Sequence, residues 1–166
     1  MNDEWKRKNM SIRYQVRDEI EEIIKEKNID RKRFYEFSKS RYSEIIDKFY
    51  YSFFEYKDRR KPASDELSYL WLRFQKQLNH SKSVYLDWSY EDFIDSINQV
   101  MPDFDESKMY YLILCHGWVY EGYISEIISI LVEIDRWIDD FYIVSKKFDW
   151  LICYCEDGDC LFSVSK

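Results

Sequence analysis

Glycine, proline and histidine are scarce in this sequence, and each shortage argues against certain structures or functions. Three Gly and two Pro among 166 residues leave little room for long flexible linkers. No Gly-rich phosphate-binding loop, nucleophile elbow or His-Glu-x-x-His helix occurs in the chain. Because only His80 and His116 are present, most acid–base and metal chemistry has few candidate side chains. We therefore expect a protein without enzymatic activity and without a cofactor.

Long apolar runs are missing as well. Residues 1–16 are rich in charge and lack the apolar stretch of roughly 7 to 15 residues that a signal peptide needs. No later stretch approaches the 18 or so apolar residues of a membrane span. We therefore expect a cytoplasmic protein that does not enter a membrane, in which the four cysteines stay reduced.

Charge is distributed unevenly along the chain. Residues 1–62 hold 17 Lys and Arg against 13 Asp and Glu, whereas residues 63–166 hold 8 against 19. The first part therefore has a net charge of +4 and the second a net charge of −11. An acidic surface repels nucleic acid and anionic lipid, and it accelerates encounter with basic proteins. We expect a basic protein partner and, because the basic runs at 31–33 and 59–61 lie among acids, no nucleic acid.

Aromatic residues are abundant, with 15 Tyr, 11 Phe and 6 Trp making up 19% of the chain. Tyr and Trp combine a large apolar area with a polar tip, so they are enriched at protein interfaces as well as in cores. An AT-rich coding sequence would raise Tyr and Phe together and explains the same numbers. Composition does not separate the two explanations.

Hydrophobic spacing predicts that residues 1–80 are mainly helical. An amphipathic stripe covers residues 11–27, and a second helical pattern capped by Asp30 runs from residue 31 to 61, where Pro62 ends it. A third pattern covers residues 65–78, with Leu67, Leu70, Trp71, Phe74 and Leu78 on one face.

Residues 83–166 predict an acidic part that mixes sheet and helix. Ser89 followed by Asp92 is close to a capping box and starts a helix that ends before Pro102. Another helix follows Gly122, and Asp157-Gly158 predicts a β-hairpin with a type I′ turn. The expected fold is a single α+β domain over residues 1–166, with a mainly antiparallel sheet and a C-terminal hairpin. The expected strands are 83–88, 109–115, 118–120, 141–144, 148–155 and 160–164.

Three of the four cysteines cluster at the expected hairpin, where Cys155 should face Cys160 and Cys153 should share their side of the sheet. We interpret them as reduced thiols that pack as small hydrophobic residues. The alternative is a metal- or thiol-dependent enzyme or regulator that uses Cys153, Cys155 and Cys160, with His116 or Cys115 as a further ligand. Cys115 and His116 themselves should point to opposite faces of one strand and should not touch.

Carboxylates gather at Asp139-Asp140 and at Glu156, Asp157 and Asp159. The second group resembles a small oxygen-ligand loop, but it has four residues where a calcium-binding EF-hand loop has twelve. Turn formation accounts for Asp157-Gly158, and we interpret the remaining acids as solvated negative charge.

The run Phe-Tyr-Ile-Val-Ser-Lys-Lys-Phe-Asp-Trp-Leu-Ile-Cys at residues 141–153 resembles the C-terminal signature of an uncharacterised family of small bacterial cytosolic proteins. The resemblance covers about a quarter of the chain, from Gly122 onward. The sequence departs from that pattern at residues 154–159, where the family tends to have paired histidines. In general character such proteins are similar to the immunity proteins encoded beside bacterial polymorphic toxins.

Together these features predict an intracellular, non-enzymatic protein-binding module, in its most concrete version an immunity or antitoxin-like protein that occludes a basic toxin domain. Acidic residues would steer the partner, and Tyr and Trp would anchor it. The expected contact residues combine aromatics with carboxylates and have few lysines nearby. They are Trp118, Tyr120, Glu121, Trp137, Asp139, Asp140, Glu156, Asp157 and Asp159.

Overall fold

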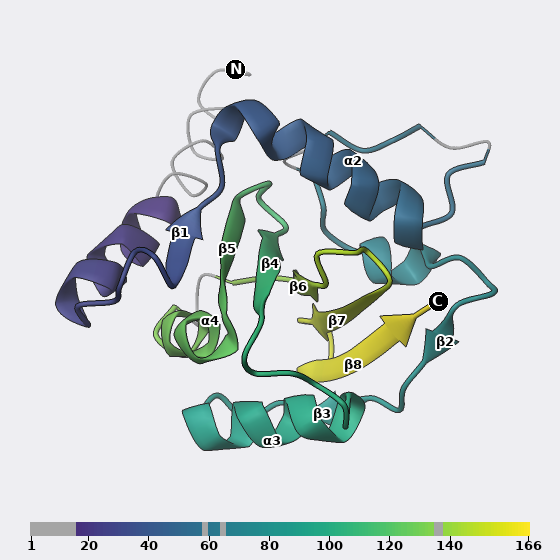
Figure 1. Ribbon diagram of the computed structural model, residues 1–166. Coiled ribbons are helices and arrows are strands. Elements are labelled where there is room, and N and C mark those ends of the chain that lie inside the picture. The colour runs from purple at the N-terminus through teal and green to yellow at the C-terminus, as the bar shows by residue number, and fades with distance from the viewer. Residues whose placement is uncertain (1–15, 58–59, 64–65, 135–137) are drawn as a thin grey trace, which may run out of the picture.

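An antiparallel sheet forms the centre of the computed structural model, which describes residues 16–57, 60–63, 66–134 and 138–166 (Figure 1). The order across the sheet is β1-β5-β4-β6-β7-β8-β2, and β3 also pairs with β8. The expected α+β class is confirmed, as is the C-terminal hairpin, which β7 and β8 form. The strands are β1 Phe34–Glu36, β2 Asn79–His80, β3 Val84–Tyr85, β4 Met109–Leu114, β5 Val119–Tyr123, β6 Phe141–Val144, β7 Trp150–Cys155 and β8 Cys160–Ser165.

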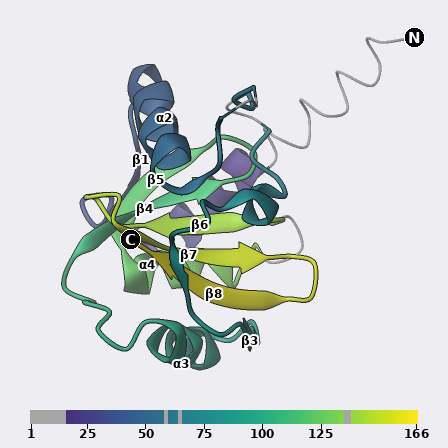
Figure 2. The ribbon, with the colours of Figure 1, turned by 90° about the vertical axis from the view of Figure 1, so that its right-hand side faces the viewer.

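Helices cover both faces of this sheet. Helix α2 (Tyr42–Phe53) lies on one face, and α3 (Tyr90–Val100) and α4 (Ile124–Leu131) lie on the other (Figures 1 and 2). Neighbouring residues of β6 show the division, because they point to opposite faces. The Tyr142 ring packs on Phe49 of α2 at 4.9 Å, whereas the Phe141 ring stacks on Phe93 of α3 at 6.2 Å. No helix of the described residues has the length and hydrophobicity needed to cross a membrane.

The first expected helix lies partly outside the described residues, and its described part is helical over residues 16–26. The second, over residues 31–61, was predicted correctly only where α2 lies. Residues 34–36 instead form strand β1, in which the fully buried Phe34 stacks on Tyr120 at 5.1 Å. The backbone oxygen of Asp30 accepts from the N–H groups of Arg33 and Phe34, so Asp30 closes a turn and begins no long helix. Pairing with β5 has overridden the local helical pattern.

The third expected helix, over residues 65–78, was also wrong. Only the short 3₁₀ helix η2 (Leu70–Arg73) forms there, and a second 3₁₀ turn, η1 (Lys39–Arg41), precedes α2. Phe74 pairs in an isolated bridge with Phe54, directly after the end of α2. Backbone hydrogen bonds from Glu55 to Arg73 and from Gln75 to Phe53 complete this contact. Leu67, Leu70, Phe74 and Leu78 are buried, but through long-range pairing and not along a helix.

Most of the second half agrees with the sequence pattern. Helix α3 begins at Ser89, whose Oγ accepts a hydrogen bond from the Asp92 N–H at 3.2 Å, as the capping pattern predicts. Strands β4 to β8 lie within two residues of their expected positions, apart from β5, which continues to Tyr123. The turn of the C-terminal hairpin is a correction, because positive φ occurs at Gly158 (96°) and Asp159 (48°) and not at Asp157. The connection is therefore a four-residue loop, although Cys155 pairs with Cys160 as expected.

Gly122→Ala is expected to destabilise the protein, because a Cβ at this position would lie 2.7 Å from Cδ2 of Phe34 and 3.0 Å from the carbonyl oxygen of Arg33. Overpacking of this kind lowers the free energy of unfolding by about 1–3 kcal/mol, measurable by urea denaturation. In the control Gly158→Asn, nothing lies within 4 Å of the added Cβ, and Asn tolerates positive φ, so the loss should stay below about 1 kcal/mol. A Gly122→Ala variant of wild-type stability would contradict close packing of β1 on β5.

Candidate functional site

Three loop segments, two of them acidic, meet at one end of the sheet. Leu114 of β4 pairs with Phe141 of β6, and Cys155 of β7 pairs with Cys160 of β8, so β4 and β7 end where β6 and β8 begin. Figure 2 shows the β7–β8 loop at the right-hand end of the sheet. We call the segments that follow or precede these strand ends, residues 115–117, 138–140 and 156–159, the acidic end.

Asp140 holds the acidic end together from inside. Its side chain is 3% exposed, and its two oxygens accept hydrogen bonds from the N–H of Tyr69 at 2.9 Å and from the N–H of Glu156 at 3.0 Å. The Asp140 carbonyl also accepts from the Cys115 N–H at 3.3 Å. One residue therefore joins the loop before η2, the β7–β8 loop and the end of β4.

Cys115, His116 and Asp139 bring three different ligand atoms together. Cys115 Sγ lies 3.6 Å from His116 Nδ1 and 3.8 Å from Asp139 Oδ2, and the ligand atoms of the three residues all lie within 4.8 Å of one another. The expectation that Cys115 and His116 do not touch was wrong. Strand β4 ends at Leu114, and both residues lie in the turn closed by the Gly117 N–H and the Leu114 carbonyl, so strand alternation does not apply to them.

The electrostatics of this end disfavour a further negative charge. Burial raises the pKa of the Cys115 thiol to about 12, and the nearby charge of Asp139 adds to the effect. Partial burial also raises the pKa of Glu156, with a further contribution from Asp139. Within the described residues, none of the five carboxylates at this end forms an ion pair with Lys or Arg. The carboxylates at the acidic end therefore lie close together, and no Lys or Arg of the described residues pairs with them.

Cys153 and Cys155 are packed thiols, whereas Cys160 is partly exposed. Cys153 is fully buried, and burial raises its pKa well above the usual range. Burial likewise raises the pKa of Cys155 to about 12, and its thiol donates to the Asp157 carbonyl at 3.2 Å. The alternative ligand set of Cys153, Cys155 and Cys160 with His116 is not assembled. Among the described residues, three metal-ligating groups converge only at Cys115, His116 and Asp139.

The residues expected to contact a partner divide into buried and exposed groups. Asp139, Glu156 and Asp157 are exposed and Asp159 is half-buried, whereas Trp137 lies outside the described residues. The structure places the other four, Trp118, Tyr120, Glu121 and Asp140, in the interior, each at most 4% exposed. Among the expected contact residues that the structure describes, the outward-facing ones are therefore Asp139, Glu156, Asp157 and, in part, Asp159.

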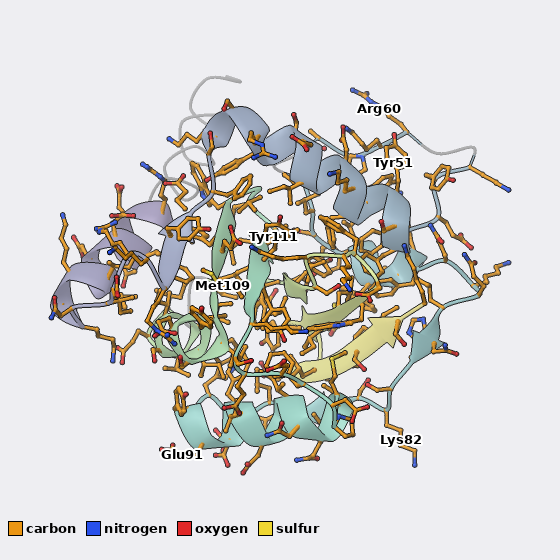
Figure 3. All side chains as sticks on the ribbon, in the orientation of Figure 1. Tyr51, Arg60, Lys82, Glu91, Met109 and Tyr111 are labelled. Carbon is orange, nitrogen blue, oxygen red and sulfur yellow. The ribbon has the colours of Figure 1, made fainter. Side chains whose placement is uncertain are left out.

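Glu121 is buried because its charge is paired. It faces the same side of the sheet as Tyr111, its partner in the β4–β5 register, which Figure 3 labels. Its carboxylate forms an ion pair with Lys146 and accepts a hydrogen bond from the Tyr35 hydroxyl. Removing one partner of a buried pair costs more than the pair itself contributes, so we interpret this contact as structural.

The sequence pattern did not predict two exposed apolar residues, Tyr69 (61% exposed), which lies beside the acidic end, and Leu72 (66% exposed), three residues further along the chain. Tyr69 has a positive φ of 59° and lines a surface hollow with Glu156, Asp157 and Gly158. Both residues fall off the apolar stripe of the helix expected over 65–78. Their position outside the apolar stripe is the one feature of the sequence that indicates their exposure.

Asp140→Asn is expected to lower the free energy of unfolding by about 1–3 kcal/mol, because an amide has one acceptor oxygen and leaves one of the two N–H groups that bind the buried carboxylate without a partner. Asp139→Asn is the matched control. It makes the same chemical change one residue away on an exposed side chain, and it should alter stability by no more than about 0.5 kcal/mol. Urea denaturation in the presence of a metal chelator measures both, and equal effects would show that Asp140 does not join the loops.

The chain was then compared with known proteins. No curated protein and no solved structure matches it. A protein-family model matches residues 12–166, which include every strand of the sheet and all three segments of the acidic end. Because this match spans nearly the whole chain, the protein belongs to the family of unknown function DUF6756.

Proposed function

We propose that this chain is an intracellular, non-enzymatic binding module that captures a basic protein at the acidic end. The observation that carries the proposal is the exposure of Glu156 and Asp157 beside the exposed ring of Tyr69, with the exposed Leu72 three residues further along the chain. Carboxylates at the rim and large apolar groups between them are the composition of a protein-binding surface. Burial raises the pKa of Glu156 and repulsion from Asp139 adds to the effect, and a cationic partner would offset that repulsion.

The two kinds of residue have different tasks in this mechanism. Exposed carboxylates attract a basic protein over distances of about one Debye length and raise the association rate. Tyr69 and Leu72 then lose contact with water against the partner, which slows dissociation. The Tyr69 backbone is already fixed by its hydrogen bond to Asp140, so less conformational entropy is lost on binding.

In the concrete version of this proposal the chain is a bacterial immunity protein that covers a basic toxin domain. The supporting feature is the resemblance at residues 141–153, which form β6, the turn after it and the first four residues of β7. Most of these side chains are buried in the sheet, so the resemblance concerns the core and leaves the binding surface free to differ. Variable surfaces on a common core suit proteins that each recognise one partner.

Co-expression with the product of the neighbouring gene tests the immunity version. We expect a stable complex of the two proteins and restored growth of cells that this product otherwise inhibits. If no complex forms and growth is not restored, the immunity version is wrong.

The double variant Glu156→Gln/Asp157→Asn should lower the association rate constant with that product by roughly threefold to tenfold at low salt, because it removes two steering charges. The difference should shrink as salt is raised. Stopped-flow or biosensor kinetics measure the rate.

Asp103→Asn/Glu106→Gln is the control for this measurement. It removes the same two charges from exposed residues near the start of β4, at the opposite end of that strand from Cys115. Its association rate should stay close to that of the wild type. Equal losses in both double variants would mean that net charge acts without a localised site.

A further inference from the structure

We infer that Cys115, His116 and Asp139 form a zinc-binding site with one coordination position open to solvent or to Glu156. The inference does not rest on the proposed function, because the three residues hold their ligand atoms together within this chain. Cys115 and His116 lie in the turn after β4, and Asp139 lies just before β6. Glu156 begins the β7–β8 loop.

The distances already present suit a tetrahedral ion. Zinc binds sulfur at about 2.3 Å, nitrogen at about 2.0 Å and oxygen at about 2.1 Å. At tetrahedral angles these bond lengths place the sulfur about 3.6 Å from the nitrogen and from the oxygen. Cys115 Sγ lies 3.6 Å from His116 Nδ1 and 3.8 Å from Asp139 Oδ2. Both distances from the sulfur therefore match a tetrahedral zinc site to within a few tenths of an ångström, and the ligand atoms of all three residues lie within 4.8 Å of one another.

The ligand chemistry selects the metal. A thiolate and an imidazole are poor ligands for Ca²⁺ and Mg²⁺, which prefer oxygen, but both bind Zn²⁺ well. Three protein ligands with a fourth position left open describe zinc sites that exchange water or a substrate. His116 is half-buried and Asp139 is exposed, so this fourth position faces the surface.

The surroundings hold the ligands in place and favour a cation. The Cys115 N–H donates to the Asp140 carbonyl, and the Cys115 carbonyl accepts from the Leu67 N–H at 3.1 Å, so the ligand backbone is fixed on both sides. Glu156 lies close enough to Asp139 for their charges to repel, and a divalent ion would convert this repulsion into attraction. Zinc binding would release the Cys115 thiol proton to solvent, leaving a thiolate bound to the metal.

Titration of the chelator-treated, untagged full-length protein with Co²⁺ tests the site, because cobalt reports zinc sites by absorption. We expect one Co²⁺ per chain, a sulfur-to-cobalt charge-transfer band, the strong visible bands of tetrahedral cobalt, and loss of both on addition of Zn²⁺. Cys115→Ser should abolish the charge-transfer band. His116→Gln and Asp139→Asn should each weaken Zn²⁺ binding by about tenfold or more.

Cys160→Ser is the matched control, because it removes a partly exposed thiol that lies outside the cluster. It should keep both the cobalt spectrum and the zinc affinity. The inference is overturned if the wild-type protein shows no thiolate band with Co²⁺, or if Cys160→Ser loses the band while Cys115→Ser keeps it. Should Cys115→Ser fail to fold, unchanged zinc affinity in His116→Gln and Asp139→Asn would overturn it equally.

Discussion

The buried carboxylate of Asp140 accepts hydrogen bonds from the backbone N–H groups of Tyr69 and Glu156, which belong to loops far apart in the sequence. A carboxylate with two N–H donors is a strong acceptor pair, and its burial is tolerable only because both donors are present. These two hydrogen bonds fix the position of three segments relative to one another: the segment before η2, the start of β6 and the β7–β8 loop. The exposed Tyr69 beside the acidic loop and the ligand cluster next to Asp140 both depend on that position.

Salt bridges between the two differently charged parts of the chain do not neutralise the acidic end. Arg33 pairs with Glu126, and Lys27 pairs with Glu133, so basic residues of the first part meet acids in or just after α4. Lys146 compensates the buried Glu121. Within the described residues, these pairs leave the carboxylates of Asp139, Glu156, Asp157 and Asp159 without a Lys or Arg partner. The uneven charge of the sequence thus persists locally in the folded protein, at one end of the sheet.

Local signals in the sequence predicted the second half of the fold and failed where pairing is long-range. Ser89 and Asp92 start α3 as a capping pattern should, and the apolar runs after residue 108 become β4 to β8. Residues 34–36 carry a helical pattern but pair with β5, more than eighty residues away, and no local signal contains that contact. At the candidate site, Asp139 and Glu156 were expected to be exposed, whereas the contact of Cys115 with His116 was not. That contact depends on β4 ending one residue earlier than its apolar run.

The strands at both borders of the sheet are very short, and this limits how another protein can bind. Strand β1 offers three residues, and β2 and β3 offer two residues each. Between β2 and β3, Ser81 exchanges hydrogen bonds with Ser163 and occupies the remaining backbone of β8. An incoming strand would find too few unpaired backbone groups to extend the sheet at either border. The proposed recognition of a basic protein would therefore take place through side chains, where a few substitutions can change the partner without changing the fold.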